Sequence, residues 1–177
     1  LRYGAWRASG AGRLGTVLLL HGRTEFIEKH FETIADLCAR GYSVFTLDWR
    51  GQGLSDALNG QPLKGHVNDY RDYLDDLDLF VRTVVSTDDQ EPERLIILGH
   101  SMGAHVGLRY CHDHPDQVAR AVFCAPLIKI ETRRIPGAFS TIAARVISAL
   151  GFHTSYVPGR AAYWTARQKF DGNPLTS

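Results

Sequence analysis

The sequence predicts an α/β fold built on a doubly wound, mostly parallel sheet, and two observations support this fold class. Apolar runs of strand length alternate with segments whose apolar residues recur at helical spacing, and the connections between them are short. Such alternation is typical of right-handed βαβ units, which place helices on both faces of a parallel sheet. The 177 residues, 44% hydrophobic and 22% charged, suffice for one domain with a substantial core.

The chain opens with two predicted strands and a helix. Residues 1–7 alternate like a strand, and residues 14–20 (LGTVLLL) form a short apolar run that predicts a buried parallel strand. A helix is expected next, because four apolar residues then fall on one helical face: Ile27, Phe31, Ile34 and Cys38. We expect Thr24 to be its N-cap and Gly41 to end it.

The following segments repeat the same alternation. Strands are predicted at residues 42–47, 94–98 and 118–125, and Pro126 ends the last of them. The amphipathic segments between them predict helices over about 70–84 and 101–112. The order of these elements completes the predicted βαβ series.

The pattern changes after about Leu127. One helical stripe follows and ends at Gly151, and no strand comes after it; its apolar residues are Phe139, Ile142, Ala143, Val146, Ile147 and Leu150. A helical cap inserted into the sheet topology explains this better than an ordinary crossover helix. We therefore expect residues 1–127 to form the N-terminal part of the core and residues 128–177 to begin a cap, or lid.

The motif Gly99-His100-Ser101-Met102-Gly103 carries the strongest functional signal. It is a G-x-S-x-G sequence between a predicted strand and a predicted helix, the context in which the serine sits on a sharp turn and presents its hydroxyl as a nucleophile. The glycines permit that tight turn, and open α/β sheets bind ligands at this end of their strands. Ser101 is therefore the predicted nucleophile, with Gly99, His100 and Gly103 supporting the turn.

His21 and Gly22 also end a buried strand, upstream of the serine. Where a serine sits on such a turn, one oxyanion-hole amide comes from the loop after an early strand and the other from the residue after the nucleophile. The candidates are the backbone N–H groups of Arg23 and Met102. We expect the His21 side chain to be a structural hydrogen-bonding group rather than a catalyst, with Gly22 present so that the backbone can approach closely.

Asp48 begins a glycine-rich loop after the strand at residues 42–47. It is a candidate for the acid of a catalytic triad. We favour a bracing role, in which its carboxylate lies beside Arg50 and binds loop amides, because this type of fold places its acid after the serine in chain order.

Three blocks of sequence together resemble one family: HGRTEFIEKH (21–30), DWRGQGLSD (48–56) and GHSMGAH (99–105). They are similar to the bacterial lysophospholipase and monoacylglycerol lipase branch of the α/β hydrolases, and the related serine aminopeptidase branch shares much of the pattern. The closing FDGNPLTS (170–177) resembles a segment of the cap in those lysophospholipases. One departure is Ala104, where the family often has another glycine.

The resemblance implies an α/β-hydrolase fold larger than this chain. The family's catalytic Asp and His lie after the cap, on later strands, and no residue here matches them. We therefore expect the triad Asp and His to be absent from this sequence, and the chain to be truncated at both ends. On its own, the chain is expected to be almost inactive.

The expected function is carboxylic ester hydrolysis through an acyl-enzyme on Ser101, as in a lysophospholipase or monoacylglycerol lipase. The alternatives are a serine aminopeptidase of the same fold and a non-catalytic binding protein on this scaffold. An aminopeptidase needs acidic residues to hold a substrate ammonium group, but the expected cap is mostly basic. It has Glu131 and Asp171 against Arg133, Arg134, Arg145, Arg160, Arg167 and Lys169. Whether its apolar stripe lines an acyl-chain site or packs against the core is left open.

No cofactor and no metal site are expected, because the eight histidines do not cluster at metal-ligand spacing. The net charge of +1 gives no indication of a nucleic-acid partner. The expected partner is a small, lipid-like ester. The three cysteines, in apolar segments and odd in number, are expected to be buried free thiols, which favours a cytoplasmic location. Peripheral contact with a membrane is left open, as is the oligomeric state.

Overall fold

A computed structural model of the chain describes residues 1–9, 12–58, 65–86, 95–129 and 137–152. The chain divides into two units, residues 1–130 and 131–177, which are described separately below. The expected boundary between core and cap lay between residues 127 and 128. That the second unit begins a cap stays a prediction.

The first unit contains one five-stranded sheet in the order β1-β3-β2-β4-β5. Its strands are β1 (Tyr3–Trp6), β2 (Gly15–Leu20), β3 (Tyr42–Leu47), β4 (Leu95–His100) and β5 (Val118–Cys124). Strand β1 runs antiparallel to β3, and the other neighbouring pairs are parallel. The mostly parallel sheet predicted from the sequence is therefore confirmed.

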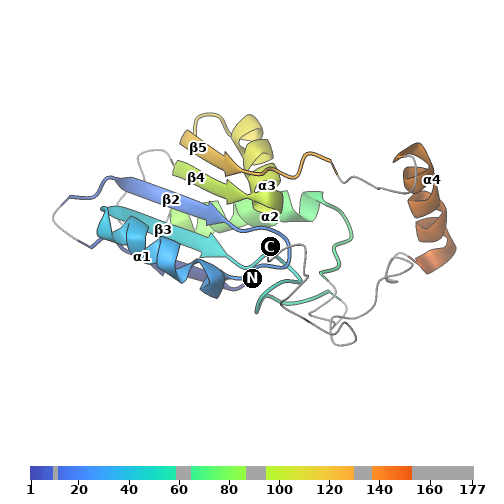
Figure 1. The fold of residues 1–177 in the computed structure, drawn as a ribbon, viewed down its shortest axis with the longest axis horizontal. Coiled ribbons are helices and arrows are strands. Elements are labelled where there is room, and N and C mark those ends of the chain that lie inside the picture. The colour runs from blue at the N-terminus through green and yellow to red at the C-terminus, as the bar shows by residue number, and fades with distance from the viewer. Residues whose placement is uncertain (10–11, 59–64, 87–94, 130–136, 153–177) are drawn as a thin grey trace, which may run out of the picture. The chain divides into compact units, whose positions relative to one another are not determined.

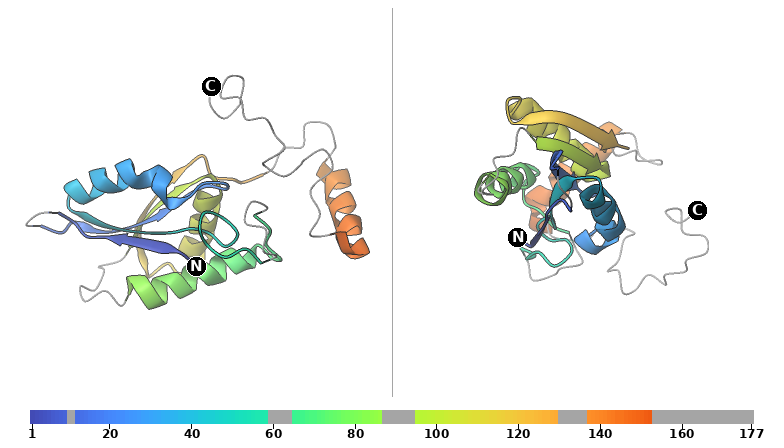
Figure 2. Two further views of the ribbon diagram at one scale, coloured as in Figure 1. Left: turned by 90° about the horizontal axis from the view of Figure 1, so that it is seen from below. Right: turned by 90° about the vertical axis from the view of Figure 1, so that its left-hand side faces the viewer.

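Helices cover both faces of this sheet (Figures 1 and 2). Helix α1 (Phe31–Ala39), preceded by a 3₁₀ turn at Ile27–His30, lies on one face. Helices α2 (Arg71–Phe80) and α3 (Ser101–Asp113) lie on the other, and α2 continues into a π-helical turn at Val81–Val85. The right-hand view of Figure 2 shows the sheet between these two layers. The doubly wound arrangement is thus confirmed.

Strand β2 shows why the short apolar run at its position becomes a central strand. Leu18 and Leu20 belong to the core beneath α2 and α3, whereas Val17 and Leu19 pack on the α1 side with Ile34. Successive side chains of a strand point to opposite faces, so a strand covered on both faces is apolar throughout. The unbroken apolar sequence therefore follows from burial on both sides.

The expected helix start at Thr24 was wrong. Thr24 has a φ of 63° and lies in a turn before the 3₁₀ segment, where its hydroxyl donates a bond to the Arg23 carbonyl. The expected end was correct: α1 stops before Gly41, which has a φ of 93° and donates its N–H to the Cys38 carbonyl. Phe31, placed on the buried stripe from the sequence, is 48% exposed.

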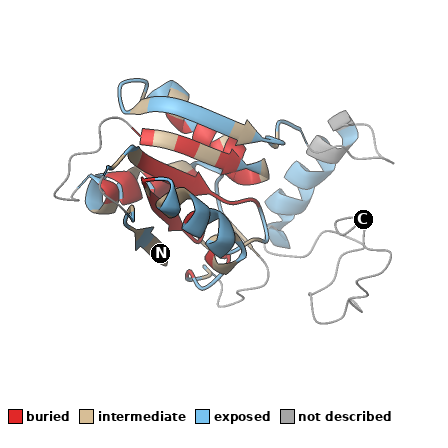
Figure 3. Ribbon diagram, turned by 60° about the vertical axis from the view of Figure 1, so that its left-hand side comes forward, coloured by how far each residue is buried: buried red, intermediate tan, exposed pale blue. Residues whose placement is uncertain are grey.

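Strand β5 forms one edge of the sheet, and most of it is exposed (Figure 3). Val122 is 54% exposed, although it lies in a strand with an apolar sequence. The cysteines are free, as expected, but their predicted burial was wrong for Cys124, which is exposed on this edge; Cys38 and Cys111 are half-buried. An apolar edge strand offers unpaired backbone groups to further strands or to other chains.

In the second unit, helix α4 (Gly137–Ile147) continues into a π-helical turn at Ser148–Phe152. Gly151 interrupts that turn with a φ of 84°, which agrees with its predicted role as the end of the helical stripe. The apolar side chains of the stripe are exposed, Phe139 by 68% and Leu150 by 67%. Among the described helices, none is long and apolar enough to span a bilayer. Of the charged residues noted in the expected cap, only Arg145 is described, and FDGNPLTS lies outside the described residues.

Candidate active site

The turn that carries the predicted nucleophile, here called the nucleophile turn, lies where β4 passes into α3. Ser101 is the first residue of the helix and has a φ of 52°, a left-handed conformation that is uncommon for any residue except glycine. The side chain is half-buried, and the Ser101 carbonyl accepts a 3.0 Å hydrogen bond from the Leu127 N–H. Such strain persists only where the surrounding structure enforces it, and it is concentrated at functional sites.

Two glycines of the motif allow this turn to pack against the sheet. A Cβ on Gly103 would lie 2.2 Å from the Leu20 carbonyl oxygen and 2.5 Å from the His21 carbonyl oxygen. A Cβ on Gly99 would lie 2.7 Å from the Cα of Ala104. All of these neighbours are backbone atoms, so any side chain at either position would push α3 away from β2 and β4.

The His21–Gly22 segment lies directly against the nucleophile turn. A Cβ on Gly22 would meet the Ser101 Cβ at 3.2 Å and the His100 Nδ1 at 3.1 Å. Behind it, the Trp49 indole donates a 2.9 Å bond to the His21 carbonyl. The structure therefore brings together the two segments that the sequence singled out, 80 residues apart in the chain.

Both ring nitrogens of His21 face groups other than Ser101, namely a backbone carbonyl and a buried carboxylate. Nδ1 is 2.8 Å from the Gly22 carbonyl oxygen, and Nε2 is 3.6 Å from Asp48 Oδ1. Both side chains are fully buried. This His–Asp pair has the composition of a catalytic dyad, but neither nitrogen faces Ser101. The geometry favours the structural role expected for His21.

Asp48 braces the loops around the site. Its Oδ1 accepts the Ile27 N–H at 2.9 Å and its Oδ2 accepts the Leu54 N–H at 3.0 Å. Burial raises the pKa of Asp48, but the nearby His21 ring and the bonds from these amides and from Arg2 outweigh it and lower the pKa overall. The charged partner is Arg2 at 3.0 Å, not Arg50 as the sequence suggested.

Arg50 instead holds helix α2 to the loop after β3. Its guanidinium donates two bonds to the Asp76 carboxylate, at 2.6 and 2.7 Å, and lies 3.1 Å from Asp72. The bond to Asp76 raises the pKa of Arg50 further. The expected bracing of this loop therefore involves two separate groups of ion pairs, one at Asp48 and one at Arg50.

The two expected oxyanion donors lie in these neighbouring segments. Met102 is the second residue of α3, where the first turn leaves N–H groups without an intrahelical acceptor. Among the described residues, no protein group accepts a hydrogen bond from the Arg23 N–H. The helix N-terminus at Ser101 adds a partial positive charge beside both donors.

Glu25 is a part of this site that the sequence did not reveal. Its Oε2 accepts the Gly22 N–H at 2.7 Å and lies 3.2 Å from His100 Nδ1, while Oε1 lies 3.4 Å from Lys29 Nζ. Burial alone would raise the pKa of Glu25, but the bonds from Gly22 and His100 and the nearby positive charges lower it to about 2. The ionised carboxylate ties the loop at residues 21–25 to His100, the residue before Ser101.

Within the described part of the chain, no imidazole or carboxylate makes a hydrogen bond to the Ser101 hydroxyl. The described residues also contain no group of three or more His, Cys, Asp or Glu side chains that could hold a metal ion. The functional groups assembled around Ser101 are thus backbone amides and the side chains that hold them.

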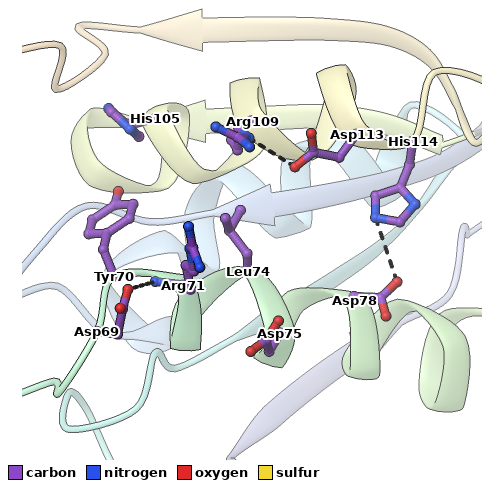
Figure 4. A pocket seen from close by; sticks show the side chains of 10 residues that line it. All are labelled: Asp69, Tyr70, Arg71, Leu74, Asp75, Asp78, His105, Arg109, Asp113 and His114. Atoms are coloured by element: carbon purple, nitrogen blue, oxygen red, sulfur yellow. Dashed lines mark hydrogen bonds and ion pairs between the residues drawn. The ribbon is translucent and has the colours of Figure 1, made fainter.

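A pocket of about 550 Å³ lies apart from this turn, between α2 and α3 (Figure 4). Its charged side chains largely pair with one another: Arg109 lies 2.9 Å from Asp113, and His114 lies 3.8 Å from Asp78. Neither Ser101 nor the loop at residues 21–25 lines it. We therefore do not assign the reaction to this pocket.

Comparison with known proteins places the chain among hydrolases. The family model "Serine aminopeptidase, S33" matches residues 12–175. The chain is 30% identical over 164 residues to a probable lysophospholipase L2 of Haemophilus influenzae, covering 90% of this chain and 49% of that protein. It is 34% identical over 133 residues to lysophospholipase L2 of Escherichia coli K12, covering 75% of this chain and 38% of that protein.

Among solved structures, the chain resembles a soluble variant of monoglyceride lipase from Saccharomyces cerevisiae in complex with a substrate analogue. The two are 27% identical with a TM-score of 0.65, and the match covers 84% of this chain and 47% of the yeast chain. The chain thus spans about half the length, or less, of the relatives it matches. With the family model matched along most of its length, and a nucleophile turn of the expected geometry, the chain belongs to the serine aminopeptidase S33 family of α/β hydrolases.

Proposed function

We propose that the protein is a serine hydrolase that cleaves carboxylic esters of lipids through an acyl-enzyme on Ser101. The observation that carries the proposal is the left-handed conformation of Ser101 at the β4–α3 turn, packed against Gly22. This conformation projects the hydroxyl from the end of the sheet, beside the amides of Arg23 and Met102.

In the proposed reaction, the Ser101 hydroxyl attacks the ester carbonyl, and the alcohol leaves as the acyl-enzyme forms; water then releases the acid. The N–H groups of Arg23 and Met102 stabilise the negatively charged oxygen of each tetrahedral intermediate. Loss of one such donor typically slows the reaction about 100- to 1,000-fold.

Serine attack requires a general base, and His21 is excluded because both of its nitrogens face other groups. We propose that the base and its acid partner lie in the part of the protein that corresponds to the remaining half of its relatives. This agrees with the absence of a described group bonded to the Ser101 hydroxyl.

A lipid substrate is supported by the names of the relatives and by a second pocket, which Ser101 does not line either but which includes Leu127, a residue bonded to the Ser101 backbone. This pocket of about 230 Å³ is lined by Leu127, Ile128 and Lys129, together with Tyr70 and His105. Leu127 donates its N–H to the Ser101 carbonyl, so the pocket begins next to the reactive turn. Apolar side chains beside one ammonium group suit a substrate with an acyl chain and a phosphate, as in a lysophospholipid.

The nucleophile is tested by labelling the full-length protein with a fluorophosphonate probe. We expect labelling of the wild type and none of Ser101→Ala, with the melting temperature of the variant close to that of the wild type. Labelling that persists in the variant would show that another residue is the nucleophile.

Substrate class is tested by comparing kcat/KM for a lysophospholipid, a monoacylglycerol and an aminoacyl-naphthylamide. We expect both lipids to be preferred to the amide, and Lys129→Met to reduce kcat/KM for the lysophospholipid more than for the uncharged monoacylglycerol. A preference for the amide would favour the aminopeptidase activity for which the family is named.

A further inference from the structure

Gln52 is a buried polar residue that the function proposed above does not yet use. It lies in the loop after β3, between Gly51 and Gly53, whose φ values of 72° and 56° are both left-handed. The Gln52 side chain is only 5% exposed, and its backbone is fixed by bonds to Trp49 and Ser55. Burying an amide side chain is costly unless its polar atoms are bonded, so its partners indicate what the residue holds in place.

Both ends of the Gln52 amide reach segments that carry a proposed oxyanion donor. Its Oε1 accepts the Thr24 N–H at 2.6 Å, next to Arg23 in the chain. Its Nε2 donates to Met102 Sδ at 3.9 Å, and Met102 is itself 2% exposed. One side chain therefore connects the 21–25 loop to the first turn of α3.

The peptide that carries the Arg23 N–H is held from three sides. This peptide group joins the Gly22 carbonyl to the Arg23 N–H, and the His21 ring lies against that carbonyl. Glu25 accepts the N–H of the preceding peptide, at Gly22. Gln52 binds the N–H of the following peptide, at Thr24. A trans peptide is planar, with its carbonyl and N–H pointing in opposite directions, so holding these groups fixes the direction of the Arg23 N–H.

Thr24 also needs support. Its φ of 63° is unfavourable for a β-branched residue, and such a conformation costs about 1 to 3 kcal/mol when nothing compensates. The bond from the Thr24 N–H to Gln52 stabilises this turn. Without this bond, the conformation of the 21–25 loop that presents the Arg23 amide is less stable.

We infer that Gln52 is a positioning residue for the oxyanion hole, holding the Arg23 and Met102 amides at a fixed separation through Thr24 N–H and Met102 Sδ. Gln52 does not touch the substrate. It acts on the transition state through the two donors, and this inference rests on the proposed function.

The test compares Gln52→Leu with wild type in the full-length protein, using hydrolysis of a p-nitrophenyl ester. Misplacing oxyanion donors by about 1 Å lowers the rate on the order of 100-fold. We expect kcat to fall about 100-fold while KM stays within about threefold of wild type, because the donors act mainly in the transition state. If the leucine variant does not fold, Gln52→Met, which keeps an unbranched chain of similar length, takes its place.

The matched control is Ser55→Ala in the same loop. Ser55 is also 5% exposed, but its hydroxyl bonds to the Asp48 carbonyl and to the Arg2 N–H rather than to the donor segments. We expect this variant to lose stability but to keep kcat near the wild-type value. A merely structural role for Gln52 would lower kcat equally in both variants.

The outcomes separate the two claims. If wild type shows turnover that depends on Ser101 but Gln52→Leu retains its kcat, or the serine control loses as much, the inference is wrong and the proposed function stands. If wild type shows no turnover that depends on Ser101, both are wrong.

Discussion

Replacing Glu25 with glutamine tests whether its charge stabilises the 21–25 loop. The substitution preserves the shape of the side chain and an oxygen that can accept the Gly22 N–H, but it removes the negative charge. That charge faces His100 at 3.2 Å, Lys29 at 3.4 Å and His30 at 3.6 Å. The Glu25 side chain is 16% exposed, so solvent screens these contacts only in part.

The size of the effect follows from the lowered pKa. A carboxyl whose pKa falls from 4.5 to about 2 on folding gains stabilisation of about 3 kcal/mol, because one pKa unit corresponds to about 1.4 kcal/mol. The Lys29 and His100 side chains are both 48% exposed, which weakens their share. We therefore expect Glu25→Gln to lower the free energy of unfolding by about 2 kcal/mol at neutral pH.

The dependence on pH provides the check. Because the pKa is lower in the folded protein, the stabilisation is fully present above pH 4.5 and disappears as the pH falls towards 2. Urea unfolding of both proteins, followed by tryptophan fluorescence, should show a difference that shrinks steadily between pH 5 and pH 3. A difference that stays constant over this range would refute the argument that the charge of Glu25 is responsible.

Three other experiments have definite expected results. Gly103→Ala should lower the free energy of unfolding by more than about 3 kcal/mol and abolish probe labelling, because its Cβ would meet backbone oxygens. The control is Gly107→Ala, whose Cβ would meet only side-chain atoms at 3.0 Å or more and which should lower the free energy of unfolding much less. Equal losses of stability in the two variants would contradict this. A double-mutant cycle on Arg50 and Asp76 should give a coupling of about 1 to 3 kcal/mol, and a value near zero would show that this partly buried pair contributes no stability. Residues 1–177 expressed alone should show only residual esterase activity, and ordinary turnover lost in Ser101→Ala would mean that a base is present and was overlooked.

Elements whose signal is local could be predicted from the sequence. The run at 14–20 became β2, and the G-x-S-x-G context became the β4–α3 turn with Ser101 at positive φ. These features depend on burial patterns and backbone requirements within a few residues. Their physical cause is therefore visible in the order of the amino acids.

The roles of Glu25 and Gln52 could not be predicted, because they depend on partners far away in the chain. Glu25 meets a histidine 75 positions later, and Gln52 meets Thr24 across 28 positions and Met102 across 50. The same reason explains the wrong partner for Asp48: Arg50 is its neighbour in sequence, but Arg2 is its neighbour in space. The charge or polarity of a buried side chain indicates that it requires a bonding partner, but the identity of that partner depends on the fold.

The close packing of Gly103 on β2 has a consequence for how this protein can change during evolution. The contact between α3 and the end of β2 is made by backbone atoms, the oxygens of Leu20 and His21. Because no side chain takes part in it, this contact does not depend directly on the identity of the surrounding side chains, whereas Gln52 acts on the neighbouring Met102 through its side chain. The smaller pocket, in contrast, is lined by side chains such as those of Ile128 and Lys129, so a substitution there changes the pocket without touching this backbone contact.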